Sequence, residues 1–556
     1  MPAESNPVRP WERAALAAIL VFMLAALTWQ AWRLGVTVDE PSHMLSAALY
    51  WQGRDVLLPR DMPPVIKIAG GWVVNRFPLN VEDAKVTAQG HEWALSRGLI
   101  MDSPPPVVQR LVFYSRLPFL IFPVLIVWLL WRWGRSLWGP AAALAIAALF
   151  VLEPTALGHG AFFKNDLAAT SGYFVFWYRL WRFWSEPTRA NAAWLGAGLL
   201  LAISAKLSML VLVAVAPAAV LLRWTTRRSL GWRWALQSTA LLLAVPYFGT
   251  MALCQFDVRR LEAEEVRLIR LTPGMPKPVI GAAKLFRHIP VAMPTWQGAV
   301  SLVRSNNARA IVYRNGRVEE KGHPFYFAGA LGVKTPAALL GLLAAGFVLM
   351  LVRRHPVAPF LLIPPLLYIG LASLSHLQLG VRLILPALPF GLLLCGPALA
   401  WRRGWIVGAA AVAAIAVQTA RVYPHGLAYF NEFAGGPANG LRYLSDSNLD
   451  WGQSLPDLAA HMRRRGIQHL TLSYFGMDSP WRHLREDEFT VLVPPWEPEY
   501  ARGEIYQPAP GLYAISASLL PGPYFRPEYR DYYREFRRRE PIARPGHGIY
   551  IYEIPE

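Results

Sequence analysis

The segment 37–43 (TVDEPSH) places two neighbouring carboxylates, Asp39 and Glu40, directly after the first long apolar run of the chain. Ionisable side chains at the end of a membrane helix are costly to keep near lipid, and such residues are candidates for function. A carboxylate there can meet a lipid-anchored substrate from one side and a water-borne hydroxyl from the other. It can then remove the proton of that hydroxyl as a general base. The alternative is local, because Asp39 before Pro41 is also a common way to begin a helix.

Further polar residues fall at what we expect to be the outer ends of apolar segments. They are His43, Lys67, His159, Asp166, Lys206, Arg382, Asp446, Asp450 and Trp451. Fixed cations at such positions can stabilise the negative charge that builds on a departing phosphate. The set therefore suits transfer of a group from a phosphate leaving group to a hydroxyl. For each basic residue the alternative is a side chain that only reaches from a helix end to the membrane interface.

Some of these residues are candidates for accessory roles. His43 follows Asp39 by four positions and would share its helical face, and His159 lies between two glycines in a predicted tight turn. Asp450 and Trp451 could hold an acceptor, the ring stacking on a sugar and the carboxylate accepting its hydroxyls, whereas Asp446 could equally cap a turn. No ligand spacing demands a metal, so a divalent ion stays an open alternative and no cofactor is predicted.

The composition is that of a polytopic membrane protein, with 54% hydrophobic residues, 23 tryptophans and only 16% charged residues. Apolar runs near the ~20 residues of a spanning helix recur along the chain. They predict about eleven spans, near 14–34, 111–131, 140–157, 167–184, 192–205, 207–224, 234–253, 335–352, 357–374, 383–400 and 404–421.

Charged residues in the short loops predict the orientation of these spans. The N-terminus and the short loops near 132–135, 182–189, 353–354 and 402–403 carry arginines, which places them in the cytoplasm by the positive-inside rule. The long segments 35–110 and 254–333 and all residues after 421 then lie outside. The net charge of +19 largely reflects this pattern and suits anionic lipid headgroups rather than nucleic acid. Cys254 and Cys395 border or lie in spans and imply no disulfide framework.

The polar segments have their own predicted elements. Two interfacial helices are expected at 41–53 and 64–77, and a charged helix at 257–270. Residues 422–556 read as a soluble α/β domain. Its predicted elements are a helix at 453–465, strands at 467–475, 511–519 and 548–554, and a charged helix near 527–539.

Four stretches of the sequence carry a family resemblance: VDEPSH, MPPVIKIAGGW, EPTALGHGAFFKNDLAATSGYF and ISAKLSMLVL. These stretches resemble the bacterial glycosyltransferase family 39 group, which includes relatives of the protein O-mannosyltransferases and of the aminoarabinose transferases that modify lipid A. LQLGVRLILPALPF and YFNEFAGGPANGLRYLSDSNLDWGQSL resemble a bacterial subgroup described as phospholipid-carrier-dependent glycosyltransferases. The resemblance extends from the first span to the end of the chain. It implies the GT-C membrane fold and a sugar donor carried on polyprenyl phosphate.

The resemblance also implies roles for individual residues. Asp39, with Glu40 beside it, matches the catalytic acidic position, and Asp166 matches the second acidic position. The donor phosphate would be contacted by Lys67, whose PPVIK segment departs from the lysine–proline spacing of the lipid A enzymes, and by Lys206 and Arg382. The C-terminal unit is not the β-trefoil of the eukaryotic mannosyltransferases and does not clearly match the lipid A enzymes, so the acceptor is not inherited from either.

The sequence therefore predicts an inner-membrane GT-C glycosyltransferase, with a transmembrane domain at 1–421 and a periplasmic α/β domain at 422–556. It would move a hexose or pentose from a polyprenyl-phosphate donor to a hydroxyl acceptor on a glycan, lipid or protein, with inversion. The cytoplasmic loops are too short for a nucleotide-binding domain, which disfavours a nucleotide-sugar donor. The alternative is a lipid or polysaccharide transporter or flippase without transferase activity, which would place ionisable groups near the bilayer midplane. A scaffold that binds cell-wall polymer leaves the paired carboxylates unexplained.

Overall fold

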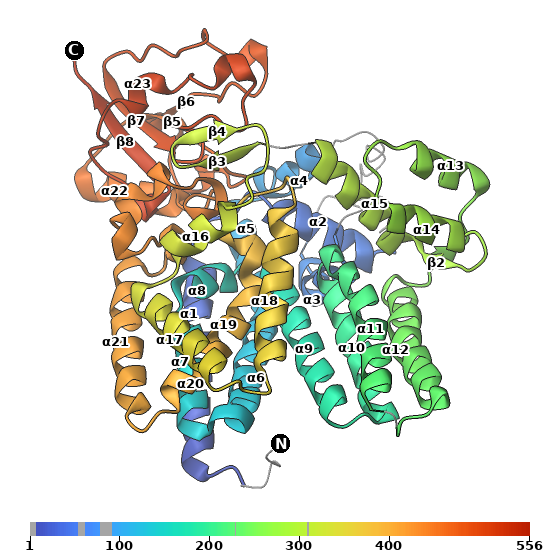
Figure 1. Cartoon of the computed structure of the whole chain (residues 1–556). Coiled ribbons are helices and arrows are strands. Elements are labelled where there is room, and N and C mark those ends of the chain that lie inside the picture. The colour runs from blue at the N-terminus through green and yellow to red at the C-terminus, as the bar shows by residue number, and fades with distance from the viewer. Residues whose placement is uncertain (1–6, 54–61, 78–91, 228, 309–310) are drawn as a thin grey trace.

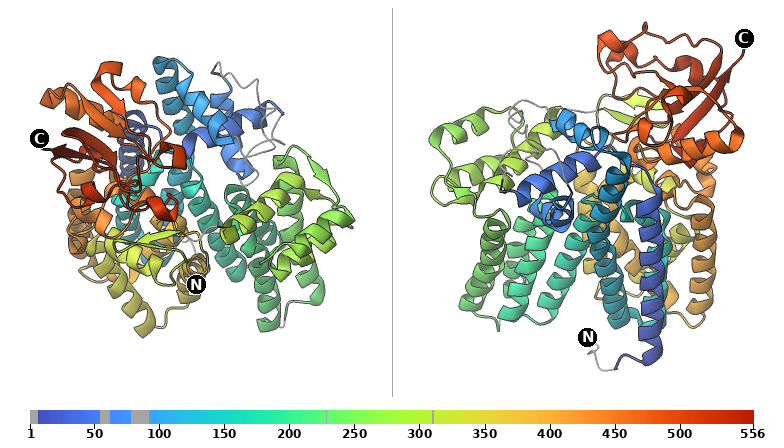
Figure 2. Two further views of the ribbon diagram at one scale, coloured as in Figure 1. Left: turned by 90° about the horizontal axis from the view of Figure 1, so that it is seen from above. Right: turned by 180° about the vertical axis from the view of Figure 1, so that it is seen from behind.

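The computed structural model describes residues 7–53, 62–77, 92–227, 229–308 and 311–556. Long helices form a bundle with the N-terminus at one end, and a mixed α/β unit and smaller helical segments lie at the other end (Figure 1). We call this second end the outer end. Seen from above, the α/β unit and the segment α13–α15 lie on opposite sides of the outer end (Figure 2, left).

Six apolar helical segments among the described residues are long enough to cross a membrane. They are α1 (Pro10–Arg33); α5 (Pro105–Arg116), η3 (Leu117–Leu120) and α6 (Ile121–Trp138) together; η4 (Leu207–Val211) with α11 (Leu212–Thr226); α12 (Trp232–Leu253); η5 (Val381–Ala387), α19 (Leu388–Leu394) and α20 (Gly396–Leu399) together; and α21 (Gly404–Val422). Several of these helices have a proline near their start. It is tolerated there because backbone N–H groups in the first turn have no carbonyl acceptor within the helix, so no hydrogen bond is lost.

Two bent helix pairs raise this number to eight. α7 (Pro140–Leu152) and α8 (Pro154–Gly160) meet at 61°, and α16 (Tyr326–Lys334) and α17 (Ala337–Val352) meet at 118°. The three other predicted spans are also helical, as α9 (Asp166–Ser185), α10 (Arg189–Ala205) and α18 (Ala358–Ser373). α10 and α18 are shorter than the ~20 residues of a typical span, and α9 carries two arginines, Arg179 and Arg182, in its second half. About eleven spans therefore stays a prediction.

Helices form at both segments for which interfacial helices were predicted. They are α2 (Glu40–Trp51) and α3 (Pro64–Val74), and α4 (Glu92–Met101) follows them. Their position in the membrane interface stays a prediction, and α2 is buried from Glu40 to Tyr50. The helix expected at 257–270 begins only at α13 (Ala263–Leu271), because Val258–Arg259 (β1) pairs with Val291–Ala292 (β2). α14 (Lys277–Leu285), α15 (Met293–Ala308) and the hairpin β3 (Val312–Arg314) and β4 (Arg317–Glu319) complete this region.

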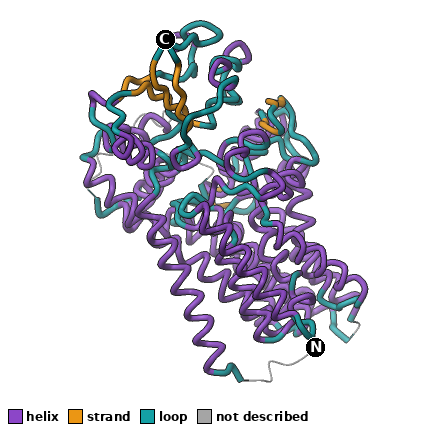
Figure 3. Tube along the Cα trace, turned by 90° about the vertical axis from the view of Figure 1, so that its left-hand side faces the viewer, coloured by secondary structure: helices purple, strands orange, loops and turns teal. Residues whose placement is uncertain are grey.

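The C-terminal residues form a four-stranded sheet at the outer end of the bundle (Figure 3). Its order is β6 (Phe489–Val491), β5 (Leu470–Ser473), β7 (Gly511–Ser516) and β8 (Ile549–Ile554); the first three are parallel and β8 is antiparallel to β7. α22 (Leu455–Arg465) packs against the sheet and ends at Gly466, whose left-handed backbone conformation suits glycine. β6 was not predicted from the sequence.

The charged helix predicted near 527–539 is wrong. Only two short pieces form, η13 (Pro527–Tyr529) and α23 (Arg534–Arg537). Tyr532, Tyr533 and Phe536 are fully buried in an aromatic cluster against the sheet. Packing of these rings decides the local backbone, and tertiary contacts of this kind commonly override helix propensity.

The orientation can be tested by labelling, because both native cysteines are buried and contribute little background. Asp487 is exposed in the C-terminal α/β unit, and Arg189 is exposed at the opposite end of the bundle, where α10 begins. In spheroplasts we expect Asp487→Cys to react with a membrane-impermeant maleimide and Arg189→Cys to react only after lysis. The reverse pattern would overturn the outer placement of every candidate site residue.

Candidate active site

Asp39 lies between α1 and α2 and is held by two cations from distant parts of the chain. Its Oδ2 accepts a hydrogen bond from Lys164 Nζ at 2.6 Å and lies 3.2 Å from an Arg382 guanidinium nitrogen. Burial by itself raises the pKa of the Asp39 carboxyl, but the charges of Lys164 and Arg382 outweigh burial and hold that pKa well below its usual range. Its side chain makes no capping hydrogen bond to α2, so helix capping does not account for this residue.

Asp166 begins α9 and extends the same network. Its Oδ1 lies 3.6 Å from Lys206 Nζ, and its Oδ2 lies 4.0 Å from the Arg382 guanidinium. These are ion-pair distances, and neither oxygen has a hydrogen-bond partner among the described residues although both are buried. Arg382 thus bridges Asp39 and Asp166. Three cations face two carboxylates, which leaves an excess positive charge for an anion.

His43 lies one turn after Asp39 on α2 and contacts the same lysine. Its Nε2 lies 3.1 Å from Lys164 Nζ. Burial and the neighbouring Lys164 charge hold the pKa of His43 well below its usual range, so the ring is neutral. An ammonium can only donate, so Nε2 accepts and Nδ1 carries the proton. This buried Nδ1–H has no partner among the described residues and is a donor for a ligand.

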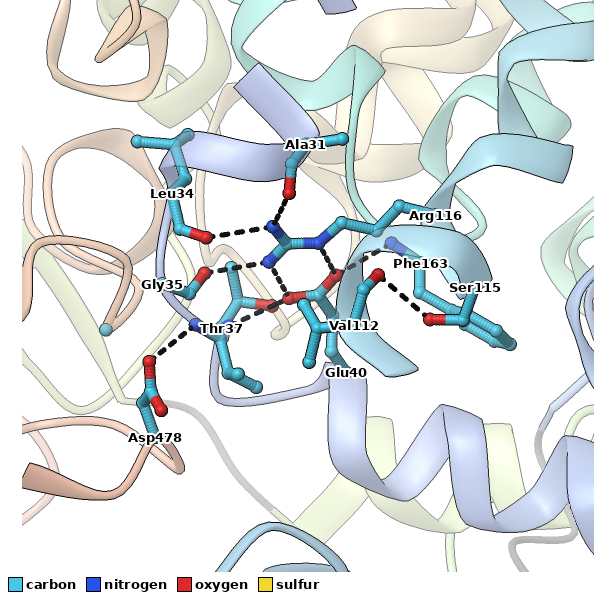
Figure 4. A network of polar contacts seen from close by, with 12 residues as sticks. Ala31, Leu34, Gly35, Thr37, Glu40, Val112, Ser115, Arg116, Phe163 and Asp478 are labelled. Atoms are coloured by element: carbon cyan, nitrogen blue, oxygen red, sulfur yellow. Dashed lines mark hydrogen bonds and ion pairs between the residues drawn. The ribbon is translucent and has the colours of Figure 1, made fainter. Parts of the chain in front are cut away.

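Glu40 does not face the site but forms a fully buried ion pair with Arg116 (Figure 4). Two Arg116 nitrogens donate to the two carboxylate oxygens at 2.7 Å each, and Thr37 and Phe163 donate backbone N–H groups at 2.9 Å. Arg116 also donates to three carbonyls at the end of α1, those of Ala31, Leu34 and Gly35. Both Glu40 oxygens are occupied in fixing the loop that carries Asp39, so this geometry does not favour the predicted catalytic role of Glu40.

Trp451 and Asp450 form part of the scaffold beneath the site, which favours a structural role over the predicted acceptor role. Trp451 is 2% exposed, and the Arg382 guanidinium lies 4.4 Å from its ring centre, as in a cation–π contact. Asp450 is fully buried and accepts backbone N–H groups from Gly452 and Ser518. Burial raises its pKa to about 7. Both side chains are therefore covered in this structure.

His159 and Asp446 take structural positions around the same junction. His159 is buried on α8, with its ring 5.9 Å from that of Trp451. Asp446 accepts hydrogen bonds from Tyr524 and from the backbone of Ser447, in agreement with the turn alternative. η9 (Asp446–Asn448) also holds the arginine-bearing element, because Asn448 Oδ1 accepts the N–H of Val381 at 3.0 Å.

Lys67 lies on α3, which packs along α2, and its side chain is 3% exposed. Its contact with the donor phosphate stays a prediction. Among the described residues, no group of three His, Cys, Asp or Glu side chains is arranged to hold a metal ion.

Two residues were not among the predicted site residues. Lys164 belongs to the turn that also carries Asp166, and its charge was a candidate to compensate the carboxylates Asp39 and Glu40; the structure pairs it with Asp39. Arg116 lies inside a long apolar segment, and an arginine in such a segment is itself a signal for a partner carboxylate.

An apolar cavity of about 260 Å³ begins on the element that carries Arg382. It lies among η5, α17, α18 and α19, and its walls include Val381, Ile384, Leu343 and Ile369. The acidic lining residue is Glu153, which caps α8 by accepting the N–H of Ala156 at 2.6 Å. The cavity is therefore mainly apolar, and its lining residues Val381 and Ile384 flank Arg382 along η5.

No protein-family model matches the sequence, and no curated protein was found to be similar to it. The structure is similar to that of ArnT from Cupriavidus metallidurans in the apo state, with a TM-score of 0.48 and 13% identity over 97% of each chain. The same enzyme bound to undecaprenyl phosphate gives 0.47 and 15% over 97% of each chain. The arabinofuranosyltransferase AftD from Mycobacteria gives 0.41 and 15%, covering 99% of this chain and 40% of AftD. At these TM-scores neither fold nor activity follows from the likeness.

Proposed function

We propose that this chain is an inner-membrane glycosyltransferase that moves a sugar from a polyprenyl-phosphate donor to a hydroxyl acceptor on the periplasmic side. The observation that carries the proposal is the position of Asp39. It is an ionised carboxylate shared by Lys164 and Arg382 at the outer end of the bundle, and an apolar cavity starts on the same element as Arg382.

The site suits a donor with an anionic head group attached to a hydrocarbon chain. The excess positive charge of Lys164, Lys206 and Arg382 over Asp39 and Asp166 suits a phosphate. The adjoining apolar cavity suits the first isoprenoid units of the carrier, because burial of such groups is favourable by about 0.8 kcal/mol per methylene.

In this proposal Asp39 acts as the general base. The acceptor oxygen attacks the anomeric carbon of the sugar opposite the phosphate, and a new C–O bond forms as the bond from that carbon to the phosphate oxygen breaks. The hydroxyl proton passes to Asp39, and the electron pair of the broken bond leaves with the polyprenyl phosphate. Attack from the opposite side inverts the anomeric centre.

The same cations also tune the base. A carboxylate paired with two cations is a weak base, but a bound phosphate competes for Arg382 and Lys164. Loss of part of that pairing raises the pKa of Asp39 towards a value useful for proton transfer. Donor binding therefore activates the base at the moment when the sugar is in place.

The buried charges at the two bent helix pairs do not favour the transporter alternative. Glu153 caps α8, and Lys334 Nζ donates to the carbonyls of Leu427 and Asn448 at 2.7 Å each. Both side chains thus stabilise backbone at the helix breaks. Glu153 does line the apolar cavity, but its carboxylate is engaged in capping α8, and Lys334 is not among the lining residues, whereas a transport path requires ionisable groups that face the transported ligand.

Arg382→Gln is expected to weaken binding of a polyprenyl-phosphate sugar about 10- to 100-fold, because a hydrogen bond to a charged group contributes roughly 1.5–3 kcal/mol. Binding to purified protein in nanodiscs, measured by microscale thermophoresis, checks this. Arg189→Gln, at the opposite end of the bundle, is the matched control and should bind as wild type. Equal donor affinity of Arg382→Gln and wild type would mean that the phosphate is held elsewhere.

A further inference from the structure

A groove of about 690 Å³ lies where the soluble sheet meets the first external segment. One wall consists of residues that follow β5 and β6, and the other includes Arg97 and Met101 of α4. Its volume is within the ~300–1,000 Å³ of typical small-molecule sites. None of the site residues predicted from the sequence lines it.

The groove gathers nearly all the exposed large apolar side chains of the soluble unit. Trp481, Trp496 and Tyr500 are 53%, 38% and 46% exposed, and Val491 and Val493 lie beside them. After residue 422 the other exposed large apolar side chains are Phe433 and Ile542. A concentrated apolar patch on a soluble unit marks an interaction site, whereas apolar side chains on the membrane helices are covered by lipid.

The aromatic side chains continue inwards from the groove. The Trp496 ring lies 6.4 Å from that of Phe475, which stacks on Tyr524 at 5.3 Å. Tyr524 in turn hydrogen bonds to Asp446 in the turn that holds the Arg382 element. The groove also lies at the carboxyl ends of the parallel strands β5 and β6, the edge at which open α/β sheets bind ligands.

The groove adjoins the catalytic loop. Val38, the residue before Asp39, lines it. The soluble unit fixes this loop through three hydrogen bonds: Gly35 N–H to the Gln453 carbonyl at 2.9 Å, Val36 N–H to Asp478 Oδ2 at 3.1 Å, and Val38 N–H to the Trp451 carbonyl at 2.9 Å. Asp478 itself lines the groove, so the groove wall and the base are held as one unit.

We propose that this groove binds the acceptor as a carbohydrate chain, with sugar rings lying on Trp481, Trp496 and Tyr500 and the reacting hydroxyl directed past Val38 to Asp39. The proposal rests on the proposed function. Aromatic faces offer sugars a flat apolar surface, and the guanidinium of Arg97 and the hydroxyl of Tyr500 are donors for sugar oxygens.

A carbohydrate suits the groove better than a peptide strand. β6 is an edge strand of three residues, which offers little backbone for added strand pairing. The groove instead presents separate aromatic rings, and its lining includes Val38, the neighbour of the proposed base Asp39. A peptide ligand is the competing outcome of the test.

The test uses the full chain, purified in detergent and fluorescently labelled, on arrays of bacterial oligosaccharides and of periplasmic peptides. Wild type is expected to retain at least one class of oligosaccharide. Trp481→Ala and Trp496→Ala should each weaken that binding about tenfold or more, as expected for removal of a central aromatic contact. Trp405→Ala, on the membrane helix α21, is the matched control and should bind as wild type. The proposal would be overturned if wild type bound only peptides, if it bound no glycan, or if all variants bound the glycan equally.

A donor-binding measurement separates this proposal from the proposed function. Trp481→Ala should bind polyprenyl-phosphate sugar as wild type, whereas Arg382→Gln should lose donor affinity but still bind the retained oligosaccharide. Glycan binding in the groove without any donor binding by wild type would refute the proposed function and leave the groove as a glycan site. Donor binding and transfer that are unaffected by both tryptophan replacements would place the acceptor elsewhere.

Discussion

Asp39→Asn is expected to reduce sugar transfer about 10²- to 10⁴-fold, the range associated with loss of a general base. The amide keeps the size of the side chain but cannot accept the hydroxyl proton. Donor binding should be retained or strengthened, because Lys164 and Arg382 lose a competing carboxylate and remain available to phosphate. The measurement is single-turnover transfer from a labelled polyprenyl-phosphate sugar, together with donor affinity on the same preparations.

Asp487→Asn provides the matched control, since it makes the same chemical change at an exposed position of the soluble unit. It should transfer at the wild-type rate. Near-normal single-turnover rates for Asp39→Asn would contradict the base assignment and direct attention to Asp166, the other carboxylate in contact with Arg382.

Glu40→Gln is expected to lower the free energy of unfolding by about 3–5 kcal/mol, because it leaves the fully buried Arg116 charge without its partner. The amide would also present N–H groups towards donors that now bind carboxylate oxygens. Unfolding in detergent followed by intrinsic fluorescence measures the difference.

Glu186→Gln is the suitable reference for that experiment. Glu186 pairs with Arg182 at 3.4 Å on the surface, where the pair contributes only about 0–1 kcal/mol. It should unfold as wild type. A Glu40→Gln protein with unchanged stability and lost transfer would show instead that Glu40 acts in the chemistry.

The sequence predicted the positions of the helices but not which side chains pair with one another. Long apolar runs located each helix of the bundle, and the alternation of arginine-rich and long polar loops grouped Asp39, Asp166, Lys206 and Arg382 at one end. Pairing across 343 positions, as between Asp39 and Arg382, leaves no local signal. Glu40 illustrates the same limit, since its partner Arg116 lies 76 positions away in an apolar segment.

The errors in the soluble unit have a common cause. Trp451 and Asp450 have the residue types of a sugar-binding pair, but both are buried. The Trp451 ring contacts the Arg382 guanidinium, and both Asp450 carboxylate oxygens accept hydrogen bonds from backbone N–H groups. The aromatic residues that are exposed, Trp481 and Trp496, occur in irregular segments without periodicity. Exposure is decided by tertiary packing, so sequence pattern could not separate these two groups.

The most direct test of the central claim is mass spectrometry of lipid-linked sugars and envelope glycans in a strain that lacks this protein. We expect the strain to accumulate a polyprenyl-phosphate sugar and to contain an envelope glycan, lipid or protein that lacks the corresponding sugar. Wild-type protein should restore both pools, and Asp39→Asn, expressed at the same level, should restore neither. Unchanged pools in the deletion strain, or full restoration by Asp39→Asn, would contradict the account.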